Sequence, residues 1–433
     1  MMWTRIIPSL LLLAASAPAV AQSGGNPAIT VIAVPPLTTP DSGDKGNETL
    51  ATAWQATQLI VSDLRATSDV MPLPPNQKDY YSFPEVTAPT FTKWRAAGAK
   101  VLLTGFVQAR ADGRLTFGCY AYDTVKGREV ARKGFVVAPG DWRRAAHKCA
   151  GLAYTAATGA PGVFDTRIAY VARSGNGAAT VQRIAVMDSD GFGHSFLTAG
   201  DTMVVSPRLS PGGNQVAFVS YVGGKPAIRL ADIEAKSDRP LVGGDALTFA
   251  PRFSPDGTRI AFSMMTGTNS DIYLASSGGG VPQRLTTAPG IDTAPAFSPD
   301  ARQILFESDR SGSPQLYVMN ADGSGQRRLS FGGGWYSAPE WSPDGEWIAF
   351  TRRGTDGLRI GVMRADGGGE RVITSGPNDD SPSWAANSHA LLFQRIDGAG
   401  RTAIYRMTVD GGTPQKLVTP QDGSDPDWSA QKD

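Results

Sequence analysis

The sequence predicts a multidomain chain: a small N-terminal α/β domain (residues 22–160), then an all-β six-bladed β-propeller (164–433) that the C-terminal strand closes. The first observation is a repeated phrase, "APEWSPDGEWIAF" at 338–350, whose serine recurs every 44 residues over four copies. The second is six short apolar runs of the "IAF" type, and the third is the final "DPDWSA" (425–430), half a phrase without its second half. A period of roughly 40–45 residues with strand-like content is typical of propeller blades.

The first 21 residues have the order of features expected of a secretory signal peptide. Arg5 supplies the positive charge, residues 6–17 are apolar, and Ala19-Val20-Ala21 is a small-x-small cleavage site before Gln22. The apolar stretch is too short to cross a bilayer, and no later segment is long and apolar enough. We therefore expect an exported, soluble mature protein without a membrane span.

The segment that follows the signal peptide lacks the repeat and mixes two kinds of apolar pattern. Helical spacing predicts helices, whereas alternation or a short apolar run predicts strands. We expect Asp141 to cap the last helix and Gly159 to end it, with residues 160–165 as the linker. The expected strands are 28–37, 100–108, 114–124 and 129–138, and the expected helices are 48–67, 91–99 and 141–159.

Each period of the repeat divides into four strands. The first is of the type P-x-[FW]-S, and a Ser-Pro-Asp-Gly turn joins it to the second, because Pro fixes φ and Gly accepts the positive φ of a hairpin. Pro343, Asp344 and Gly345 recur in kind in other blades, so we interpret them as turn residues and not as a site. The first blade begins at its second strand, "IAY" (168–170), so the terminal strand should pair with it and leave no open edge.

Charge and cysteine content limit the possible partners. Removal of residues 1–21 takes away one basic residue and no acidic one, which leaves 40 of each and a net charge of zero. This argues against nucleic acid, which usually requires a basic face. In an oxidising compartment Cys119 and Cys149 can form a disulfide, but two buried free thiols are equally compatible with the sequence.

A search for catalytic and metal motifs finds none of the familiar ones. The chain has no G-x-S-x-G elbow, Walker A loop, H-E-x-x-H or C-x-x-C. His147, His194 and His389 are scattered and are interpreted as surface or packing residues. Acidic clusters at 378–380 and 422–427 could hold Ca²⁺, but neither has the EF-hand spacing. We expect a binding scaffold without a cofactor or resident metal, and not an enzyme.

One rim of the propeller is the expected binding surface. The loops that lead from each fourth strand into the next inner strand surround one mouth of the channel, and they differ from blade to blade. Apolar side chains there would anchor a partner and acidic ones would match its charge, unless these residues only cap strand ends. The candidates are Leu247, Thr248, Phe249, Asp292, Thr293, Trp335, Tyr336, Ser337, Asp379, Asp380 and Asp425.

Several stretches resemble the TolB family. The junction "GVFDTRIAYV" (162–171), "WRAAGAKVLLTGFV" (94–107), the "AAH" helix (145–147) and the six blades carry the resemblance, which covers nearly the whole mature chain. It implies a periplasmic, non-enzymatic protein that binds the lipoprotein Pal at the channel mouth, around Leu247–Phe249 and Thr293. It also implies contact with the inner-membrane protein TolA through the mature N-terminus, and a role in outer-membrane constriction at division and envelope integrity.

The chain departs from the family pattern at two places. The N-terminal arm that would hold TolA, with Gln22, Asn26 and Ile29, is short and Gly-rich, and Leu247 and Phe249 make the rim more apolar than expected. Two alternatives remain. One is the propeller of a dipeptidyl-peptidase-like hydrolase without its catalytic domain, and the other is a glycan-binding propeller with an aromatic rim.

Overall fold

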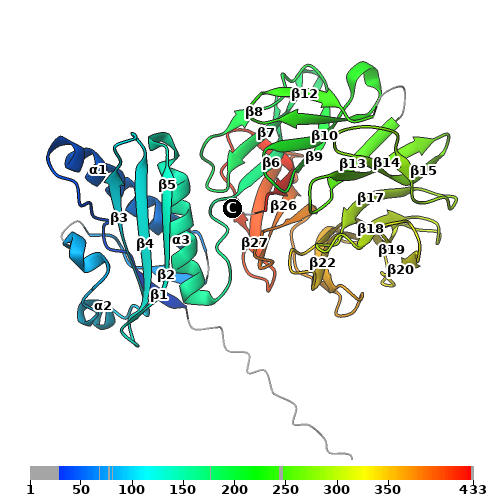
Figure 1. Cartoon of the computed structure of the whole chain (residues 1–433). Helices are drawn as coiled ribbons and strands as arrows, with labels where there is room; N and C mark the ends of the chain where they lie inside the picture. Colours follow the sequence, from blue (N-terminus) through cyan, green and yellow to red (C-terminus); the bar gives the residue numbers. More distant parts are fainter. Residues whose placement is uncertain are drawn as a thin grey trace, which may run out of the picture.

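The structure, a computed structural model, describes residues 29–430 except residues 68, 77, 78, 80, 176 and 243–246. Two units lie side by side, an N-terminal α/β unit coloured blue to cyan and a β-propeller coloured green to red (Figure 1). The predicted fold class is therefore confirmed. Within the described ranges, no helix combines the length and the apolarity that crossing a membrane requires. The expected signal peptide lies outside the described residues.

The N-terminal unit is built on a mixed sheet of five described strands, in the order β2-β1-β3-β4-β5. The pairs that β1 forms with β2 and β3 are parallel, and β3, β4 and β5 follow as an antiparallel meander. Helices α1 and α3 cover one face with a common apolar core, and α2 lies against the other face. The bounds are β1 Thr30–Ala33, α1 Gly43–Arg65, β2 Val70–Pro72, η2 Phe83–Val86, α2 Thr92–Ala96, β3 Val101–Ala109, β4 Leu115–Asp123, β5 Arg128–Val137, η3 Pro139–Asp141 and α3 Trp142–Thr158.

The N-terminus of α3 differs from the prediction, whereas its C-terminus agrees with it. Asp141 precedes the helix, but its side chain makes no capping hydrogen bond, because the 3₁₀ turn η3 runs directly into α3 and holds Asp141 at ψ 11°. An N-cap residue normally has an extended backbone. The Asp141 prediction is therefore wrong. Gly159 does end the helix, with φ 81° and its N–H donated to the carbonyl oxygen of Thr155 at 2.8 Å.

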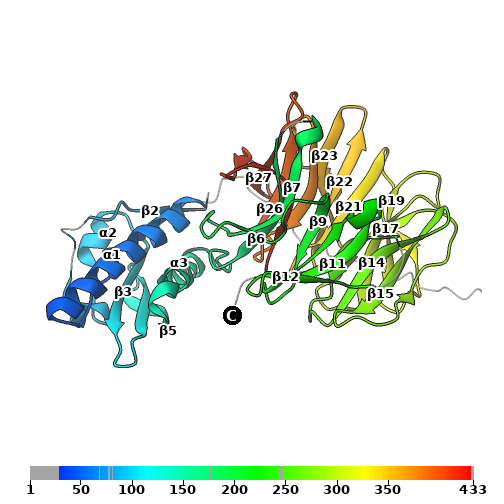
Figure 2. The same cartoon turned by 90° about the horizontal axis from the view of Figure 1, so that it is seen from above.

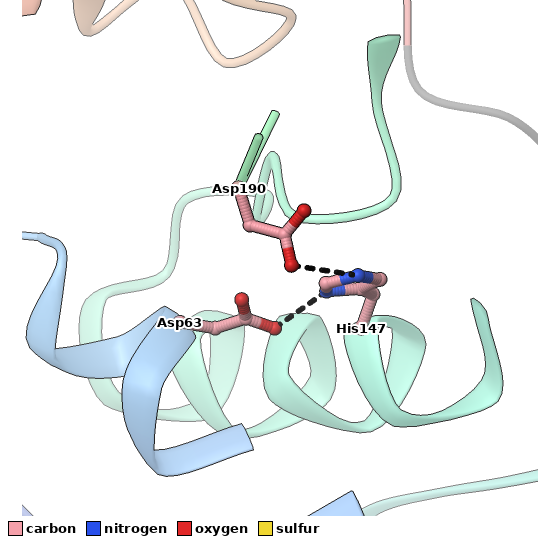
Figure 3. A group of neighbouring side chains, drawn as sticks. All are labelled: Asp63, His147 and Asp190. Carbon is pink, nitrogen blue, oxygen red and sulfur yellow. Dashed lines mark hydrogen bonds and ion pairs between the residues drawn. The ribbon is translucent and has the colours of Figure 1, made fainter. Parts of the chain in front are cut away.

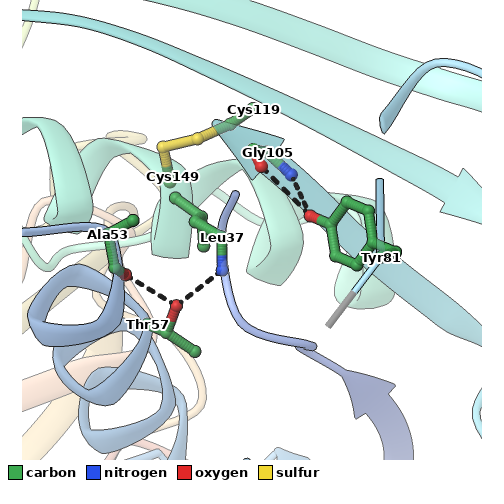
Figure 4. The surroundings of a disulfide bond; sticks show 7 residues. All are labelled: Leu37, Ala53, Thr57, Tyr81, Gly105, Cys119 and Cys149. Atoms are coloured by element: carbon green, nitrogen blue, oxygen red, sulfur yellow. Dashed lines mark hydrogen bonds between the residues drawn. A yellow bond between two sulfur atoms is a disulfide. The ribbon is translucent and has the colours of Figure 1, made fainter. Parts of the chain in front are cut away.

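A disulfide joins the meander to the last helix of the N-terminal unit. It links Cys119 of β4 to Cys149 of α3, with the two Cα atoms 5.8 Å apart (Figure 4). Thr57 of α1 lies nearby and accepts a hydrogen bond from the backbone N–H of Leu37 at 2.9 Å. Tyr81 bonds both polar backbone atoms of Gly105, at 2.9 and 3.0 Å. The Thr57 and Tyr81 hydrogen bonds hold the loops around the sheet, since each satisfies buried or half-buried backbone groups.

The propeller consists, over the described residues, of six four-stranded antiparallel sheets. Apolar cores lie between neighbouring blades, as where Phe297 and Phe306 of one blade meet Ile272 and Leu274 of the preceding one. The blades after the first are β9 Val204–Leu209, β10 Gln215–Ser220, β11 Ala227–Asp232, β12 Ser237–Pro240; β13 Leu247–Phe253, β14 Arg259–Thr266, β15 Asn269–Ser276, β16 Gln283–Arg284; β17 Asp292–Phe297, β18 Gln303–Ser308, β19 Gln315–Asn320, β20 Arg327–Arg328; β21 Trp335–Trp341, β22 Trp347–Gly354, β23 Gly357–Arg364, β24 Arg371–Val372; and β25 Asp379–Trp384, β26 Ala390–Ile396, β27 Thr402–Thr408, β28 Gln415–Lys416. Short 3₁₀ turns lie at η4 Gly177–Ala179 and η5 Val222–Gly224.

The first blade is made from both ends of the propeller sequence. Its order is β29-β6-β7-β8, with β29 Asp422–Trp428 as the inner strand and β6 Arg167–Ser174, β7 Val181–Asp188 and β8 Ser195–Phe196 outside it. The red and green strands meet accordingly in Figure 2. Trp428 Nε1 donates to Thr166 Oγ1 at 2.8 Å, and the N–H of Arg167 donates to Ser429 Oγ at 2.9 Å. The predicted closure by the C-terminal strand is confirmed.

The Ser-Pro-Asp-Gly turns explain why the phrase recurs. In the turn between β21 and β22, Ser342 Oγ donates to the carboxylate of Asp344 and accepts the N–H of Trp347 at 2.9 Å, while Gly345 has φ 76°. Two blades have a non-glycine residue at the glycine position. Ala301 has φ 58° and Ser388 has φ 61°. The Ala301 turn keeps the bond from Ser298 Oγ to Asp300, and in the Ser388 turn Asn387 Oδ1 accepts the N–H of His389 at 3.0 Å. Side-chain hydrogen bonds therefore hold these turns, and glycine only removes strain.

Candidate partner-binding site at the channel mouth

All six inner strands share one irregularity near their start. The register of each against its second strand shifts. At the shift lies a non-glycine residue with positive φ, followed by a proline. This left-handed conformation costs about 1 kcal/mol or more per residue, and a bulge bends its strand and re-aims side chains. The six residues are Ser206, Ala250, Ala294, Ala338, Ser381 and Asp425, with φ between 48° and 55°.

The six bulges surround a cavity at one mouth of the channel. Its volume is about 250 Å³, and every blade contributes to its lining through a residue at or beside the bulge. The wall is therefore built from rigid Xaa-Pro pairs, on which the neighbouring side chains are held in fixed positions. The lining residues are Ser206, Arg208, Ala250, Pro251, Arg252, Thr293, Ala294, Pro295, Glu307, Ser337, Ala338, Pro339, Asp380, Ser381 and Asp425.

Deeper in the channel, four of the six residues that follow these prolines are charged, namely Arg208, Arg252, Glu340 and Asp427. Arg252 contacts Glu340 Oε2 and Asp427 Oδ1, each at 3.2 Å. Arg208 lies 3.8 Å from the same Asp427 oxygen. Burial raises the pKa of Glu340, against the lowering effect of Arg252, and burial together with Arg252 lowers the pKa of Arg208. Two arginines and two acids pair with one another here, so this depth of the channel carries no excess charge.

The mouth itself is more acidic. Glu307 of β18 lines the cavity, and burial, with the charges of Asp380 and Asp309, raises its pKa to about 7. Burial also raises the pKa of Asp425, whose Oδ1 accepts the hydroxyl of Ser381 at 3.3 Å. Asp380 accepts Thr351 Oγ1 at 2.8 Å. The negative charge of the mouth therefore grows as Glu307 ionises near neutral pH.

Some predicted site residues lie where a partner could touch them. Thr293, Ser337, Asp380 and Asp425 line the cavity. Leu247 and Phe249 are half-buried on β13 beside it. Trp335 is 50% exposed, with the guanidinium of Arg353 at 5.1 Å from its ring centroid, next to a second cavity of about 610 Å³ on the same blade.

Four other candidates are buried and bonded inside the protein. Asp292 pairs with Arg310 at 2.6 Å, and Asp379 holds Arg395 through both oxygens at 2.6 and 2.9 Å. Thr248 accepts the N–H of Ile228 at 2.9 Å, and Tyr336 donates to Glu370 at 2.7 Å. Their exposed fractions are 1% or less. These side chains hold the rim in place, so they are not available as a contact surface.

The expected N-terminal arm lies mostly outside the described residues, which include neither Gln22 nor Asn26. Ile29 is the first described residue and is 58% exposed. Several residues of the cavity are not among those predicted from the sequence. Arg208, Arg252 and Glu307 are the charged ones, and the first two occupy the variable position of P-x-[FW]-S, which was the available signal.

Comparison with known families assigns both parts of the chain. A family model described as the TolB beta propeller domain matches residues 154–432, and one described as the TolB amino-terminal domain matches residues 20–130. The chain belongs to the TolB family. The order of the two TolB regions along the chain is that of the two units described above.

Curated TolB relatives support the assignment over part of their length. A Tol-Pal system protein TolB of Zymomonas mobilis is 47% identical over 198 residues, 46% of this chain and 43% of the relative. One of Rhizorhabdus wittichii is 45% identical over 228 residues, 51% of this chain and 52% of the relative. The chain thus spans about half the length of the curated relatives that it matches.

A solved TolB structure is similar over nearly the whole chain. The crystal structure of TolB from Acinetobacter baumannii covers 93% of this chain and 97% of its own, with a TM-score of 0.78 and 26% sequence identity. The combination of N-terminal unit and propeller is therefore similar in both proteins.

Proposed function

We propose that the protein is a non-enzymatic, periplasmic component of a Tol–Pal system. It would bind Pal, at the outer membrane and peptidoglycan, through the channel mouth, and would link it to the inner-membrane Tol proteins. This linkage would serve outer-membrane constriction at cell division and envelope integrity. The observation that carries the proposal is the match of both regions, in order, to TolB family models, together with curated relatives named as Tol-Pal system proteins.

The channel mouth has the properties of a protein-binding surface. Six bulged strands make its wall rigid, so little conformational entropy is lost on binding. Its rim combines an exposed aromatic side chain, Trp335, with half-buried apolar side chains, Leu247 and Phe249. Asp380, Asp425 and Glu307 add negative charge. A partner segment that carries basic and apolar side chains would be complementary to this surface.

The N-terminus is the proposed contact for TolA. An extended arm before β1 could add a strand to a partner sheet, a common way of binding a flexible segment. β1 starts at Thr30, and Ile29 before it is exposed. Deletion of residues 22–28 from the mature protein should therefore abolish binding to the periplasmic part of TolA and leave Pal binding unchanged.

Calorimetry with the soluble part of Pal tests the main proposal. The mature chain should bind it, and Thr293→Arg should weaken binding at least about tenfold, because the long cation would fill the cavity that Thr293 lines. Val281→Arg is the matched control. Val281 is 97% exposed in the turn after β15, at the end of the blade opposite the mouth.

The outcomes separate the function from the site. Equal loss of binding in both arginine variants, or none in either, would place the Pal contact elsewhere on the chain. Absence of binding in the unmodified protein would overturn the Pal proposal and favour the glycan alternative. Peptidoglycan pull-down would then be the next measurement.

A further inference from the structure

Three titratable side chains meet where the N-terminal unit touches the propeller. Asp63 comes from α1, His147 from α3, and Asp190 from the loop between β7 and β8 of the first blade (Figure 3). The histidine ring lies between the two carboxylates. The three residues are far apart in sequence and come from three elements, so only the docking of the two units brings them together.

The two nitrogens of His147 face different partners. Nδ1 is 2.7 Å from Asp63 Oδ2, and Nε2 is 3.7 Å from Asp190 Oδ2. The His147 and Asp63 side chains are 3% and 4% exposed, and that of Asp190 is 22% exposed. Nε2 is buried and has no hydrogen-bond partner among the described residues. Arg143 of α3 pairs with Asp190 and lies over the Phe192 ring at 4.0 Å.

The protonation state of His147 Nε2 determines whether its interaction with Asp190 is attractive or repulsive. With Nδ1–H donated to Asp63, a neutral ring would turn the Nε2 lone pair toward a carboxylate oxygen, which is repulsive. A protonated ring carries a donor on both nitrogens and attracts both carboxylates. Two carboxylates, Arg143 and a charged His147 also sum to zero charge, whereas a neutral histidine leaves one uncompensated negative charge beside the buried ring.

We propose that Asp63, His147 and Asp190, with Arg143, form a proton-controlled latch between the N-terminal unit and the propeller. A protonated His147 bridges the two units, and loss of its proton removes the bridge and loosens their docking. The proposal rests on the interface geometry alone and is independent of the partners proposed above.

The same residues are less suited to hold a metal ion together. The two ring nitrogens point in opposite directions, so Asp63 and Asp190 cannot both share one cation with His147. Asp190 is also already paired with Arg143. A cation between Nε2 and Asp190 remains a measurable outcome of the test below.

The direction of the pKa shifts agrees with the geometry. Burial alone would lower the pKa of His147, but the hydrogen bond and charge of Asp63 and the charge of Asp190 outweigh it and raise that pKa. Burial raises the pKa of Asp63 to about 6, although the hydrogen bond and charge of His147 and the charge of Arg143 lower it. Asp190 belongs to the propeller and its charge raises both pKa values, so this part of each shift depends on docking. The contribution of a protonated His147 to docking is complete below its ordinary pKa and is lost as pH rises through its raised value.

The first experiment is NMR titration of the histidines in the intact mature protein, which has only three. His147→Gln and His389→Gln assign the resonances. His147 should titrate above about pH 6.5, and Asp190→Asn should lower its midpoint by about one unit. Because Asp190 lies on a partly exposed loop, this variant should fold. A His147 midpoint that Asp190→Asn does not move would overturn the latch.

The second experiment measures the docking itself. Spin labels on Val125→Cys and Val281→Cys, two exposed sites in different units, report the distribution of distances between the units by electron–electron resonance. The distribution should be narrow at about pH 6 and broader at about pH 8.5. In His147→Gln and Asp190→Asn it should be broad at both, and in the control Asp356→Asn, an exposed acid in the turn between β22 and β23, it should follow the unmodified protein. Equal widths at both pH values in the unmodified protein, or narrowing by added Zn²⁺ at about pH 8.5, would contradict a proton-controlled latch and, in the second case, indicate a metal site.

Discussion

At the scale of single residues, the blade turns offer a matched pair of substitutions. Ala301 and Gly345 occupy the same left-handed position in neighbouring blades, with φ 58° and 76°. Ala301→Gly should raise the free energy of unfolding by about 1 kcal/mol, because it removes backbone strain, and Gly345→Ala should lower it by a similar amount. The nearest atoms to a Cβ at Gly345 are 3.8 Å away, so the cost there is conformational and not steric. Denaturant unfolding of both variants measures this, and changes of the same sign would contradict it.

Glu307 gives a pH dependence with a defined sign. Its pKa in the folded protein is about 7, raised mainly by burial, against 4.5 as its ordinary value. Its stabilising contribution is complete below about pH 4.5 and is lost as pH rises through about 7. Glu307→Gln should therefore be more stable than the unmodified protein by about 3 kcal/mol at pH 8, and the difference should shrink toward pH 5.

The control for this prediction is Asp112→Asn. Asp112 is an exposed acid in the turn between β3 and β4. It belongs to the N-terminal unit, whereas Glu307 belongs to the propeller. Unfolding curves of both variants between pH 5 and pH 8 are the measurement. A constant difference between Glu307→Gln and the unmodified protein would mean that Glu307 does not titrate in this range.

The rim residues show which site details the sequence could supply. The repeat indicated segments that line the cavity, but it did not reveal which of their side chains are buried. In every inner strand, the residue two positions before the left-handed bulge residue is buried. These residues are Val204, Thr248, Asp292, Tyr336, Asp379 and Gly423. Alignment of the six copies with a strand period of two could have predicted this. Asp292 and Asp379 suggested an exposed acidic rim, but they are buried because each pairs with an arginine elsewhere in its blade, Arg310 and Arg395 respectively.

At the scale of elements, the closing strand can be tested with two tryptophans. Trp428 of β29 is 6% exposed and bonds to Thr166, whereas Trp335 of β21 is 50% exposed. Trp428→Ala should cost about 3–5 kcal/mol, since it leaves a cavity at the closure of the ring. Trp335→Ala should cost less than about 1 kcal/mol. Urea denaturation measures the loss of unfolding free energy in each variant. Equal losses would argue against a special contribution of the closing strand to stability.

The disulfide belongs to the N-terminal unit alone. It closes a loop with a sequence separation of 30, which predicts about 3–4 kcal/mol of stabilisation for that unit. A Cys119→Ala/Cys149→Ala double variant should shift the thermal transition of the N-terminal unit and leave that of the propeller in place. Calorimetry measures both transitions. A shift of the propeller transition by the same amount would mean that the two units unfold together.

The elements were predictable to different degrees, for physical reasons. The blades repeat, so each copy supports the others, and closure follows from the incomplete phrase at the end of the chain. The N-terminal unit has no such redundancy. The strand expected at 28–37 is only Thr30–Ala33. The cap expected at Asp141 is absent, because the Pro139–Asp141 segment forms a 3₁₀ turn that runs directly into the helix.

At the scale of the whole molecule, the sequence predicted two units but not how they meet. His147 was interpreted as a surface or packing residue, because nothing in its neighbourhood along the chain announces Asp63 or Asp190. Docking is a property of surfaces that are distant in sequence. The interface between the two units is therefore the part of the molecule that could least be predicted from the sequence.

Hydrogen–deuterium exchange is the most direct test of the proposed binding of Pal at the channel mouth. The mature chain is compared with and without the soluble part of Pal. Pal should slow exchange at the starts of β13, β17, β21 and β25, around the bulges at Ala250, Ala294, Ala338 and Ser381. Exchange in the Ser-Pro-Asp-Gly turns at the other end of the blades should not change. Protection confined to those turns, or to the N-terminal unit, would contradict it.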